Sequence, residues 1–413
     1  MKEEYLMLSV EEALERVLSA FQPLPPERIP VLETLGRVVT EDVFADMDIP
    51  PLTNSAMDGY AVRAADTART SRENPVRLRI IDNLTAGRTT QTAVTAGCSI
   101  RIMTGVPIPP GADAVVQFED TEQKQEWVEI FKDVETGMNV RLAGEDVKKG
   151  ELILPGGTLI RPQEVGMLAA LGRKEAWVHR RPRVAILATG DEVIEIDAPW
   201  SPGKIRNSNT YSNAAQVIRY GGFPIMLGIT RDDENELTAK VREGLQKGAD
   251  LFLTTGGVSM GDFDMVKKVL AAEGEMGFWR VRMKPGKPLA FGQIRGVPLL
   301  GLPGNPVSAM VTFELFARPA ILKMQGKTRL EKPIIEAKLR DEVPHKDNRR
   351  HYIRVRVERQ GSEYEAHLTG DQGSGILLSM VRSQGLAIIP EDFDHLPAGT
   401  KVPVIMLDWP EDK

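Results

Sequence analysis

The sequence is poor in the side chains that bind soft metals. It holds one cysteine, Cys98, and five histidines among 413 residues, and the histidines are not spaced as ligand pairs. Disulfides, zinc sites and iron–sulfur clusters need several cysteines or histidines at short spacing, so the composition argues against all three. Any metal bound by this chain is therefore expected to have oxygen ligands.

Long apolar runs are also missing. No stretch approaches the ~20 apolar residues that a membrane-spanning helix requires. Residues 1–16 are rich in glutamate and lack the basic-then-apolar order of a signal peptide. We therefore expect a cytoplasmic protein with no membrane partner. A net charge of −6 and the absence of an evident basic patch argue against a nucleic-acid partner.

Two common nucleotide-binding fingerprints are absent as well. The sequence contains neither Gly-x-Gly-x-x-Gly nor Gly-x-x-x-x-Gly-Lys-Ser/Thr. A standard dinucleotide site or P-loop NTPase site is therefore not supported. What is present is a globular composition, with 42% hydrophobic and 27% charged residues, over a length that indicates about three domains.

Strand-like and helix-like segments alternate from residue 183 to residue 325, which predicts a doubly wound parallel sheet. Polar residues follow each of its predicted strands, which are Val184 to Ala188, Pro224 to Thr230, Leu251 to Thr255 and Val297 to Leu302. The carboxyl ends of parallel strands lie on one edge, and ligands bind there where the strand order reverses. We therefore expect the polar ends to share one ligand site.

The loop of residues 254–264 follows the third of these strands and precedes a helix-like pattern. Its glycines can adopt φ > 0 and bring bare backbone close to a ligand. The N–H groups that open the following helix favour an anion, so the loop is typical of phosphate binding. In the alternative interpretation, the glycines only turn the chain and Asp262 or Asp264 only caps the helix.

Three carboxylates, Glu192, Asp232 and Asp264, fall on the same predicted edge. Together they form an oxygen-rich site suited to Mg²⁺, although each one alone is typical of a helix cap or a solvated charge. Lys284 and Lys287 belong to a Lys-Pro-Gly-Lys-Pro run and add two cations for a phosphate or another oxyanion. The alternative for this run is a solvated hairpin.

The remaining segments complete a multidomain α/β organisation around the doubly wound domain of residues 183–328. Residues 1–48 and 147–182 are interpreted as one discontinuous connecting domain. Residues 49–146 predict a β-rich domain, in which Asp58 before Gly59 is either functional or part of a turn. Residues 329–413 predict a small β-barrel or sandwich, and we interpret its Arg349-Arg350-His351 cluster as a solvated face.

These motifs and their order are similar to those of the molybdopterin molybdenumtransferases, the MoeA family, which is related to the C-terminal domain of gephyrin. The most specific matches are Asn54 to Ala61, Thr189 to Glu192, Gly256 to Gly261, Lys284 to Pro288 and Leu302 to Ser308. The resemblance covers nearly the whole chain. It implies a homodimer with composite active sites that uses Mg²⁺ to insert molybdate into adenylylated molybdopterin, with release of AMP.

The resemblance also implies site residues, in three groups. The catalytic group is Asp58, Asp146, Glu192 and Asp264. The metal-binding group is Glu192, Asp232 and Asp264, with Asp233 as an alternative to Asp232 and the role of Asp262 open. The cofactor-binding group comes from three segments: the loop of residues 254–264, the lysine run of residues 284–288, and the loop of residues 303–306, which we call the proline loop. Its members are Gly256, Gly257, Ser259, Gly261, Lys284, Lys287, Pro303, Asn305 and Pro306.

Two other functions stay open on the sequence alone. One is adenylyl transfer to molybdopterin, because enzymes with that activity resemble the doubly wound domain; they carry Thr-Gly after the double glycine, where this chain has Val-Ser-Met-Gly. The other is a non-catalytic, gephyrin-like scaffold, which would not need the full carboxylate set. The sequence does not separate molybdate from tungstate, because both are tetrahedral dianions of similar size.

Overall fold

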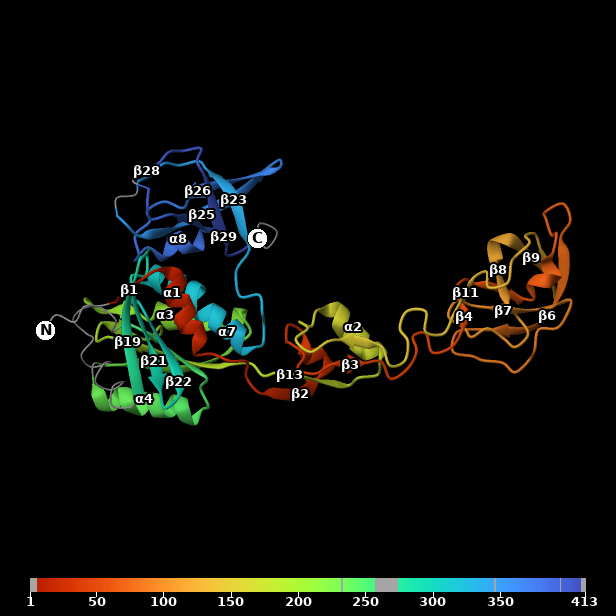
Figure 1. Ribbon diagram of the computed structural model, residues 1–413, viewed down its shortest axis with the longest axis horizontal. Coiled ribbons are helices and arrows are strands. Elements are labelled where there is room, and N and C mark those ends of the chain that lie inside the picture. Colours follow the sequence, from red (N-terminus) through yellow and green to blue (C-terminus); the bar gives the residue numbers. More distant parts are fainter. Residues whose placement is uncertain (1–5, 232, 257–273, 345–346, 394, 410–413) are drawn as a thin grey trace. The chain divides into compact units, whose positions relative to one another are not determined.

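The computed structural model describes residues 6–231, 233–256, 274–344, 347–393 and 395–409 (Figure 1). The chain divides into two compact units. The first consists of Met1–Thr40, Leu159–Arg161 and Glu175–Lys413, and the second of Glu41–Thr158 and Pro162–Lys174. No helix among the described residues is long and apolar enough to cross a bilayer.

A seven-stranded sheet forms the centre of the first unit. Its strands in spatial order are β1 (Leu6–Leu8), β19 (Gly274–Val281), β21 (Pro288–Ile294), β22 (Val297–Leu302), β18 (Leu251–Thr255), β14 (Arg183–Thr189) and β17 (Phe223–Thr230). Strands β22, β18, β14 and β17 are mutually parallel. From β14 the chain passes first to β17 on one side and then to β18 on the other. The strand order therefore reverses between β14 and β18, which is where such sheets bind ligands.

The sequence analysis predicted a parallel sheet, but the sheet is mixed. Strand β21 runs antiparallel to both β19 and β22. Only Arg295 and Gly296 separate β21 from β22, and both have φ > 0. This is a tight hairpin turn, whereas a parallel crossover needs about a dozen residues or more. The antiparallel strands lie away from the reversal point and do not alter its edge.

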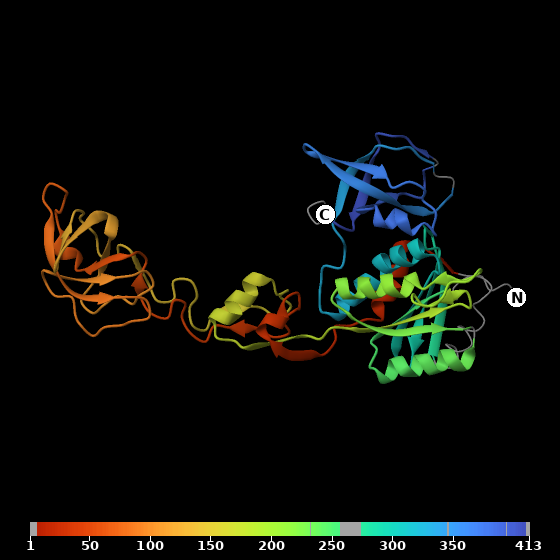
Figure 2. The ribbon, with the colours of Figure 1, turned by 180° about the vertical axis from the view of Figure 1, so that it is seen from behind.

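Alternate residues of the central strands pack into separate cores on the two faces of the sheet. Val184 and Ile186 of β14 join one core, and Ala185 and Leu187 join the other. The first face is covered by α1 (Val10–Ser19), α3 (Ser208–Arg219), α6 (Pro306–Thr312) and α7 (Arg318–Met324), and the second by α4 (Glu234–Gln246). Figures 1 and 2 show α3 and α4 on opposite sides of the sheet. Burial on both faces explains why these strands are continuous apolar runs.

The N-terminal segment belongs to this sheet rather than to the connecting segments with which the sequence analysis placed it. Strand β1 pairs in parallel with β19, and α1 contributes Val10, Ala13 and Val17 to the first core. The predicted capping box is present, because Ser9 and Glu12 exchange hydrogen bonds. The connecting pairs are β2 (Pro26–Pro30) with β13 (Glu175–His179) in the first unit, and β3 (Val43–Phe44) with β12 (Leu152–Leu154), beside α2 (Pro162–Ala170), in the second.

The C-terminal segment forms a closed β-barrel. Its strands are β25 (Arg350–Gln360), β26 (Glu363–Leu368), β23 (Ile334–Leu339), β29 (Lys401–Met406) and β27 (Gly385–Ile389), and the pairing of β27 with β25 closes the ring. Ile353, Val355 and Val357 point into its core, as their alternation predicts. The short strand β20 (Met283–Lys284) of the first unit pairs with β25, so the lysine run is attached directly to the barrel.

The second unit contains a six-stranded β-sheet, which confirms a β-rich segment. In spatial order its strands are β8 (Ala114–Gln117), β5 (Gly59–Val62), β7 (Cys98–Ile102), β6 (Val76–Leu84), β10 (Trp127–Ile130) and β9 (Thr121–Lys124). A separate pair joins β4 (Asn54–Ser55) to β11 (Val140–Arg141). A Cβ at Gly59 would lie 2.0 Å from the carbonyl oxygen of Val116. Glycine is thus needed here for close strand pairing and not for a turn.

Candidate functional site

The reversal point of the sheet brings two strand ends into unusually close contact. Gly256 follows β18 with φ of +86°, and a Cβ there would lie 2.4 Å from the carbonyl oxygen of Thr189 at the end of β14. Only glycine fits this position, because any side chain would meet fixed backbone. Bare backbone is therefore presented at the place where a ligand would approach.

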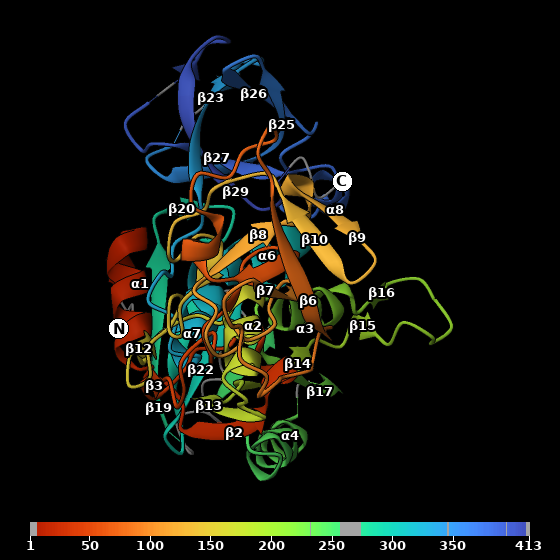
Figure 3. The ribbon, with the colours of Figure 1, turned by 90° about the vertical axis from the view of Figure 1, so that its right-hand side faces the viewer.

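A cavity of about 270 Å³ lies at this point, and we call it the edge cavity. Beyond β14, its wall includes Glu192 and the short paired strands β15 (Val193–Ile194) and β16 (Ile205–Arg206), which Figure 3 shows at the side of the sheet. The first turn of α3 contributes Asn207 and Asn209 to the wall. Gly304 in the loop before α6, Pro306 at the start of α6, and Gly375 complete the wall. The edge cavity thus combines polar side chains and exposed backbone with apolar side chains such as Val193 and Ile205.

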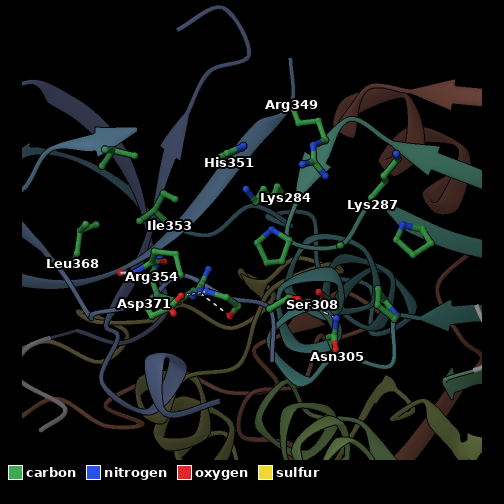
Figure 4. A pocket seen from close by; sticks show the side chains of 18 of the residues that line it. Lys284, Lys287, Asn305, Ser308, Arg349, His351, Ile353, Arg354, Leu368 and Asp371 are labelled. Atoms are coloured by element: carbon green, nitrogen blue, oxygen red, sulfur yellow. Dashed lines mark hydrogen bonds between the residues drawn. The ribbon is translucent and has the colours of Figure 1, made fainter. Parts of the chain in front are cut away.

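A second cavity, of about 660 Å³, lies between the lysine run and the barrel, and we call it the basic cavity (Figure 4). Four cationic side chains line it, namely Lys284, Lys287, Arg349 and Arg354. Asp371 is the one acidic residue in its wall among the described residues. This surplus of positive charge in a concave site attracts an anion.

Arg354 is the most deeply buried of these cations, with 1% of its surface exposed. Its Nε donates to Oγ of Ser379 at 3.1 Å, and its Nη2 donates to the carbonyl oxygen of Gly373 at 3.1 Å. Burial lowers the pKa of Arg354 to about 10, and the nearby Asp371 opposes that shift. The guanidinium is therefore charged at neutral pH, and both of these acceptors are uncharged.

Asp347 contacts three basic side chains at the basic cavity, those of Arg349, His351 and Lys284. It accepts hydrogen bonds from Nε and Nη2 of Arg349 at 2.9 and 2.7 Å, and its Oδ1 lies 3.0 Å from Nε2 of His351. Nζ of Lys284 lies 3.9 Å away. The hydrogen bonds from Arg349 hold the pKa of Asp347 well below its ordinary value, against the opposing effect of burial. Asp347 thus fixes cationic side chains in place around the cavity.

The interpretation of Arg349, Arg350 and His351 as a solvated face was wrong. His351 is 4% exposed, and both Arg349 and His351 line the basic cavity. Alternation along β25 does put Arg354 on the outer surface of the barrel. That surface is covered by α8 (Leu377–Val381) and by residues 371–374, so a tertiary contact buries a position that the local pattern exposes.

The loop of residues 303–306 lies between the two cavities, and residues 373–375 of the C-terminal segment also border both. Gly304 lines both of them, with Pro303 and Asn305 on the basic side and Pro306 on the edge side. Nδ2 of Asn209 donates to the carbonyl oxygen of Gly304 at 2.7 Å. On the other side, Nδ2 of Asn305 donates to Oγ of Ser374 at 2.9 Å. The loop is therefore held by α3 and by the barrel together.

The predicted site residues of the first unit divide between the two cavities. Glu192, Gly256 and Pro306 line the edge cavity, and Lys284, Lys287, Pro303 and Asn305 line the basic cavity. Asp233 caps α4, where its Oδ1 accepts from the backbone N–H of Glu236 at 2.8 Å. The remaining predictions lie outside the described residues, and these are Asp232, Gly257, Ser259, Gly261, Asp262 and Asp264.

Asp58 and Asp146 belong to the second unit. Oδ1 of Asp58 accepts hydrogen bonds from both the backbone N–H and the hydroxyl of Thr104, each at 2.7 Å. These bonds lower the pKa of Asp58, with the backbone donor contributing most. Asp146 is exposed, and its backbone N–H donates to the carbonyl oxygen of Ile49 at 3.0 Å. Both carboxylates are accessible on the surface of their own unit.

A magnesium site is not assembled by the described side chains alone. Among them, no three aspartate, glutamate, histidine or cysteine side chains gather in the arrangement a metal ion needs. Of the predicted metal ligands that the structure describes, Glu192 is exposed at the edge cavity, and Asp233, the alternative to Asp232, caps α4. One carboxylate falls short of the oxygen shell that Mg²⁺ takes up.

Sequence reasoning missed several residues of these walls, notably Asn207, Asn209, Arg354 and Ser374. The Asn-Ser-Asn run before a helix was a usable signal, because asparagine is a strong helix cap and two of them flank the start. Asn207 is indeed the N-cap of α3. Arg354 and Ser374 gave no such signal, since they reach the cavity only through packing of the barrel against the sheet domain.

The fold and the two cavities define a multidomain α/β protein with a ligand site at a sheet edge and an adjoining anion site. Three family models match consecutive parts of the chain. They are "MoeA N-terminal region (domain I and II)" over residues 8–172, "Probable molybdopterin binding domain" over 185–323 and "MoeA C-terminal region (domain IV)" over 336–407. The chain belongs to the MoeA family, the molybdopterin molybdenumtransferases, and is a transferase of molybdenum cofactor biosynthesis.

Individual relatives match over nearly their whole length. The molybdopterin molybdenumtransferase of Bacillus subtilis is 34% identical over 99% of this chain and 98% of its own. That of Haemophilus influenzae is 33% identical over 96% of this chain and 98% of its own. A crystal structure of the molybdopterin biosynthesis moeA protein of Pyrococcus horikoshii has a TM-score of 0.83 at 32% identity, covering 98% of this chain and all of that one. The likeness thus extends across both units.

Proposed function

We propose that this chain inserts molybdate into adenylylated molybdopterin and releases AMP. Molybdate is a compact dianion, and it needs cations and hydrogen-bond donors. The basic cavity provides these through Lys284, Lys287 and Arg354. Molybdopterin bound at the strand ends of the sheet would follow the general rule for doubly wound folds.

The observation that carries the proposal is the shared wall at Gly304. A metal oxyanion has to meet the group that receives it, so the two sites must adjoin. Gly304 lines both cavities, and Asn209 and Asn305 hold its loop from opposite sides. Proximity of this kind removes much of the entropic cost of bringing two reactants together.

Adenylyl transfer is the less favoured candidate, because enzymes with that activity carry Thr-Gly after the double glycine, where this chain has Val-Ser-Met-Gly. A scaffold function would leave the basic cavity unexplained. The cavity selects for charge and not for the central metal atom, so tungstate competes in the proposed site.

We further propose Mg²⁺ as cofactor, with Glu192, Asp232 and Asp264 as its ligands. Support comes from the carboxylate of Glu192 at the wall of the edge cavity. Bound there, the ion would neutralise charge on the phosphate oxygens while the phosphoanhydride bond breaks. The proposed enzyme is cytoplasmic and homodimeric, with composite active sites to which both protomers contribute.

The proposal is tested by supplying adenylylated molybdopterin and molybdate to the purified protein, with and without Mg²⁺ after chelation. AMP and a cofactor that activates a molybdenum-dependent apoenzyme are both expected, and only with molybdate present and Mg²⁺ restored. Lys287→Gln should weaken molybdate binding, whereas the matched control Lys401→Gln, at an exposed lysine outside both cavities, should not. AMP release without metal transfer would contradict the proposal.

A further inference from the structure

The amide of Asn207 has a fixed orientation in the edge cavity. Its Oδ1 accepts the hydrogen bond from the backbone N–H of Thr210 at 3.2 Å, as the N-cap of α3. A backbone N–H can only donate, so the other amide atom of Asn207 must be the nitrogen. That Nδ2 is buried and has no hydrogen-bond partner among the described residues, and the residue is 3% exposed.

The amide of Asn209 is fixed in the opposite sense. Its Nδ2 donates to the carbonyl oxygen of Gly304 at 2.7 Å. Because a carbonyl can only accept, the remaining atom of this amide must be the oxygen. Oδ1 of Asn209 is also buried and without a partner within the described part of the chain. The two amides thus offer one donor and one acceptor without a partner among the described residues.

Both residues line the same cavity, and an unpaired buried amide group is costly to the fold. Such groups are rare in folded proteins, and each one points to a water, an ion or a functional role at its site. We propose that Asn207 and Asn209 bind the edge of a planar heterocycle that carries an acceptor next to a donor. Nδ2 of Asn207 would donate to the acceptor, and Oδ1 of Asn209 would accept from the donor.

This inference rests on the proposed function and makes it more specific. The lactam edge of a pterin places a carbonyl oxygen beside an N–H, and adenine places a ring nitrogen beside an amino group. Adenylylated molybdopterin carries both ring systems. The edge cavity, at about 270 Å³, is slightly below the ~300 Å³ at which small-ligand sites usually begin. It would therefore hold one ring system and leave the rest of the ligand outside.

The experiment measures binding of two probes, pterin and AMP, to the full-length protein at up to millimolar concentration. Asn207→Ser keeps a helix cap and removes the amide donor without adding charge, and Asn207→Asp keeps the cap as a carboxylate. Both variants should melt within a few degrees of the wild type. Both should bind one probe about tenfold more weakly, as expected for one lost hydrogen bond. The probe that weakens identifies the ring system.

The role of Oδ1 of Asn209 as an acceptor is tested by removing the hydrogen-bond donor of the ligand. If the ring is a pterin, methylation of its lactam nitrogen should weaken binding to the wild type by a similar factor. If the ring is adenine, methylation of its amino group should do so. The assignment is overturned if neither probe binds, if only Asn207→Asp weakens binding, or if wild type and Asn207→Ser bind both probes equally. Molybdate insertion is assayed separately with the natural substrate and would stand in each of those cases.

Discussion

Nδ2 of Asn305 donates a hydrogen bond of 2.9 Å to Oγ of Ser374, across 69 positions of sequence. A second bond, from the backbone N–H of Val307 to the carbonyl oxygen of Ser374, lies beside it at 3.1 Å. Asn305 belongs to the loop shared by the two cavities, and Ser374 belongs to the barrel. The wall of the basic cavity is therefore completed only when barrel and sheet domain are packed together.

Arg354→Met is expected to weaken molybdate binding at least tenfold at pH 7. Methionine fills much of the same space, and removing a buried charge that has only uncharged hydrogen-bond acceptors should cost little stability. Equilibrium dialysis against molybdate and a thermal melt would measure the two effects. Arg354→Lys is the control, since it keeps the charge and loses the forked geometry. Unchanged molybdate affinity in Arg354→Met would show that the cavity does not use this cation.

The same residue predicts a pH limit for oxyanion binding. Burial lowers the pKa of Arg354 from 12.5 to about 10, so its charge is lost as pH rises through that value. Molybdate affinity of the wild type should fall between pH 9 and 11, and that of Arg354→Met should not show this step. The free energy of unfolding changes in the opposite direction. Between the folded pKa of about 10 and the ordinary value of 12.5, the unfolded chain binds more protons than the folded chain. The contribution of Arg354 to the free energy of unfolding therefore becomes more favourable as pH rises between these two values.

Thr104→Val should raise the pKa of Asp58 part of the way towards its ordinary 3.8. Valine removes the hydroxyl donor and leaves the larger contribution, the backbone N–H of residue 104, in place. The stability that ionised Asp58 contributes is present above pH 3.8 and is lost as pH falls through the lowered pKa. Carbon-detected NMR titration of the Asp58 carboxylate measures the shift. Thr136→Val, which removes a donor to Asp113 in the same unit, should leave it unchanged.

Gly256→Ala is expected to destabilise the protein more than Gly203→Ala. Both glycines have positive φ, at +86° and +82°, so both alanines incur a left-handed penalty of about 1–2 kcal/mol. A Cβ at 256 would also lie 2.4 Å from the carbonyl oxygen of Thr189, whereas nothing lies within 4 Å at 203. Chemical denaturation measures the free energy of unfolding of both variants, and the difference between them gives the cost of the contact with Thr189. Equal losses of free energy would mean that the strand ends separate easily.

Glu314→Gln should lower the free energy of unfolding by about 3 kcal/mol, because it leaves two buried cations uncompensated. Glu314 is 8% exposed, and its carboxylate lies 3.4 Å from Nζ of Lys332 and 3.7 Å from Nε of Arg318. Glutamine can still bond the hydroxyl of Tyr220, so packing is nearly preserved. Adding Lys332→Met to this variant should recover part of the loss. Urea unfolding of the three proteins checks both steps.

Asp58→Ala and Glu192→Ala should complement each other if active sites combine two protomers. Each variant alone is expected to be inactive. Under two-fold symmetry a mixed dimer holds one site with both residues intact, so the isolated mixed dimer should show roughly half of the wild-type activity. The proteins are co-expressed with different tags, and the mixed dimer is isolated by its two tags before assay. An isolated mixed dimer that stays inactive would place both residues in the same protomer's site.

The sequence by itself determined the four parallel strands of the sheet, their polar edge and a small β domain at the C-terminal end. Strands β14 and β18 are buried on both faces, so their residues form apolar runs. The residues after each strand are exposed and therefore polar. Both features can be seen in a short stretch of sequence. The capping box at Ser9 and the alternation of Ile353 and Val355 are equally local. The lysine run and the proline loop were found as candidates for the same reason, because their glycines and prolines constrain the backbone around them.

Tertiary structure alone decided which of those residues meet. Arg354 and His351 look like solvated positions of an exposed strand, and they become cavity walls because α8 and the lysine run cover that strand. The pairing of β1 with β19 likewise joins the N-terminus to a strand more than 260 residues later. Contacts between distant segments depend on how whole elements pack. A local pattern holds no information about the element that will cover it.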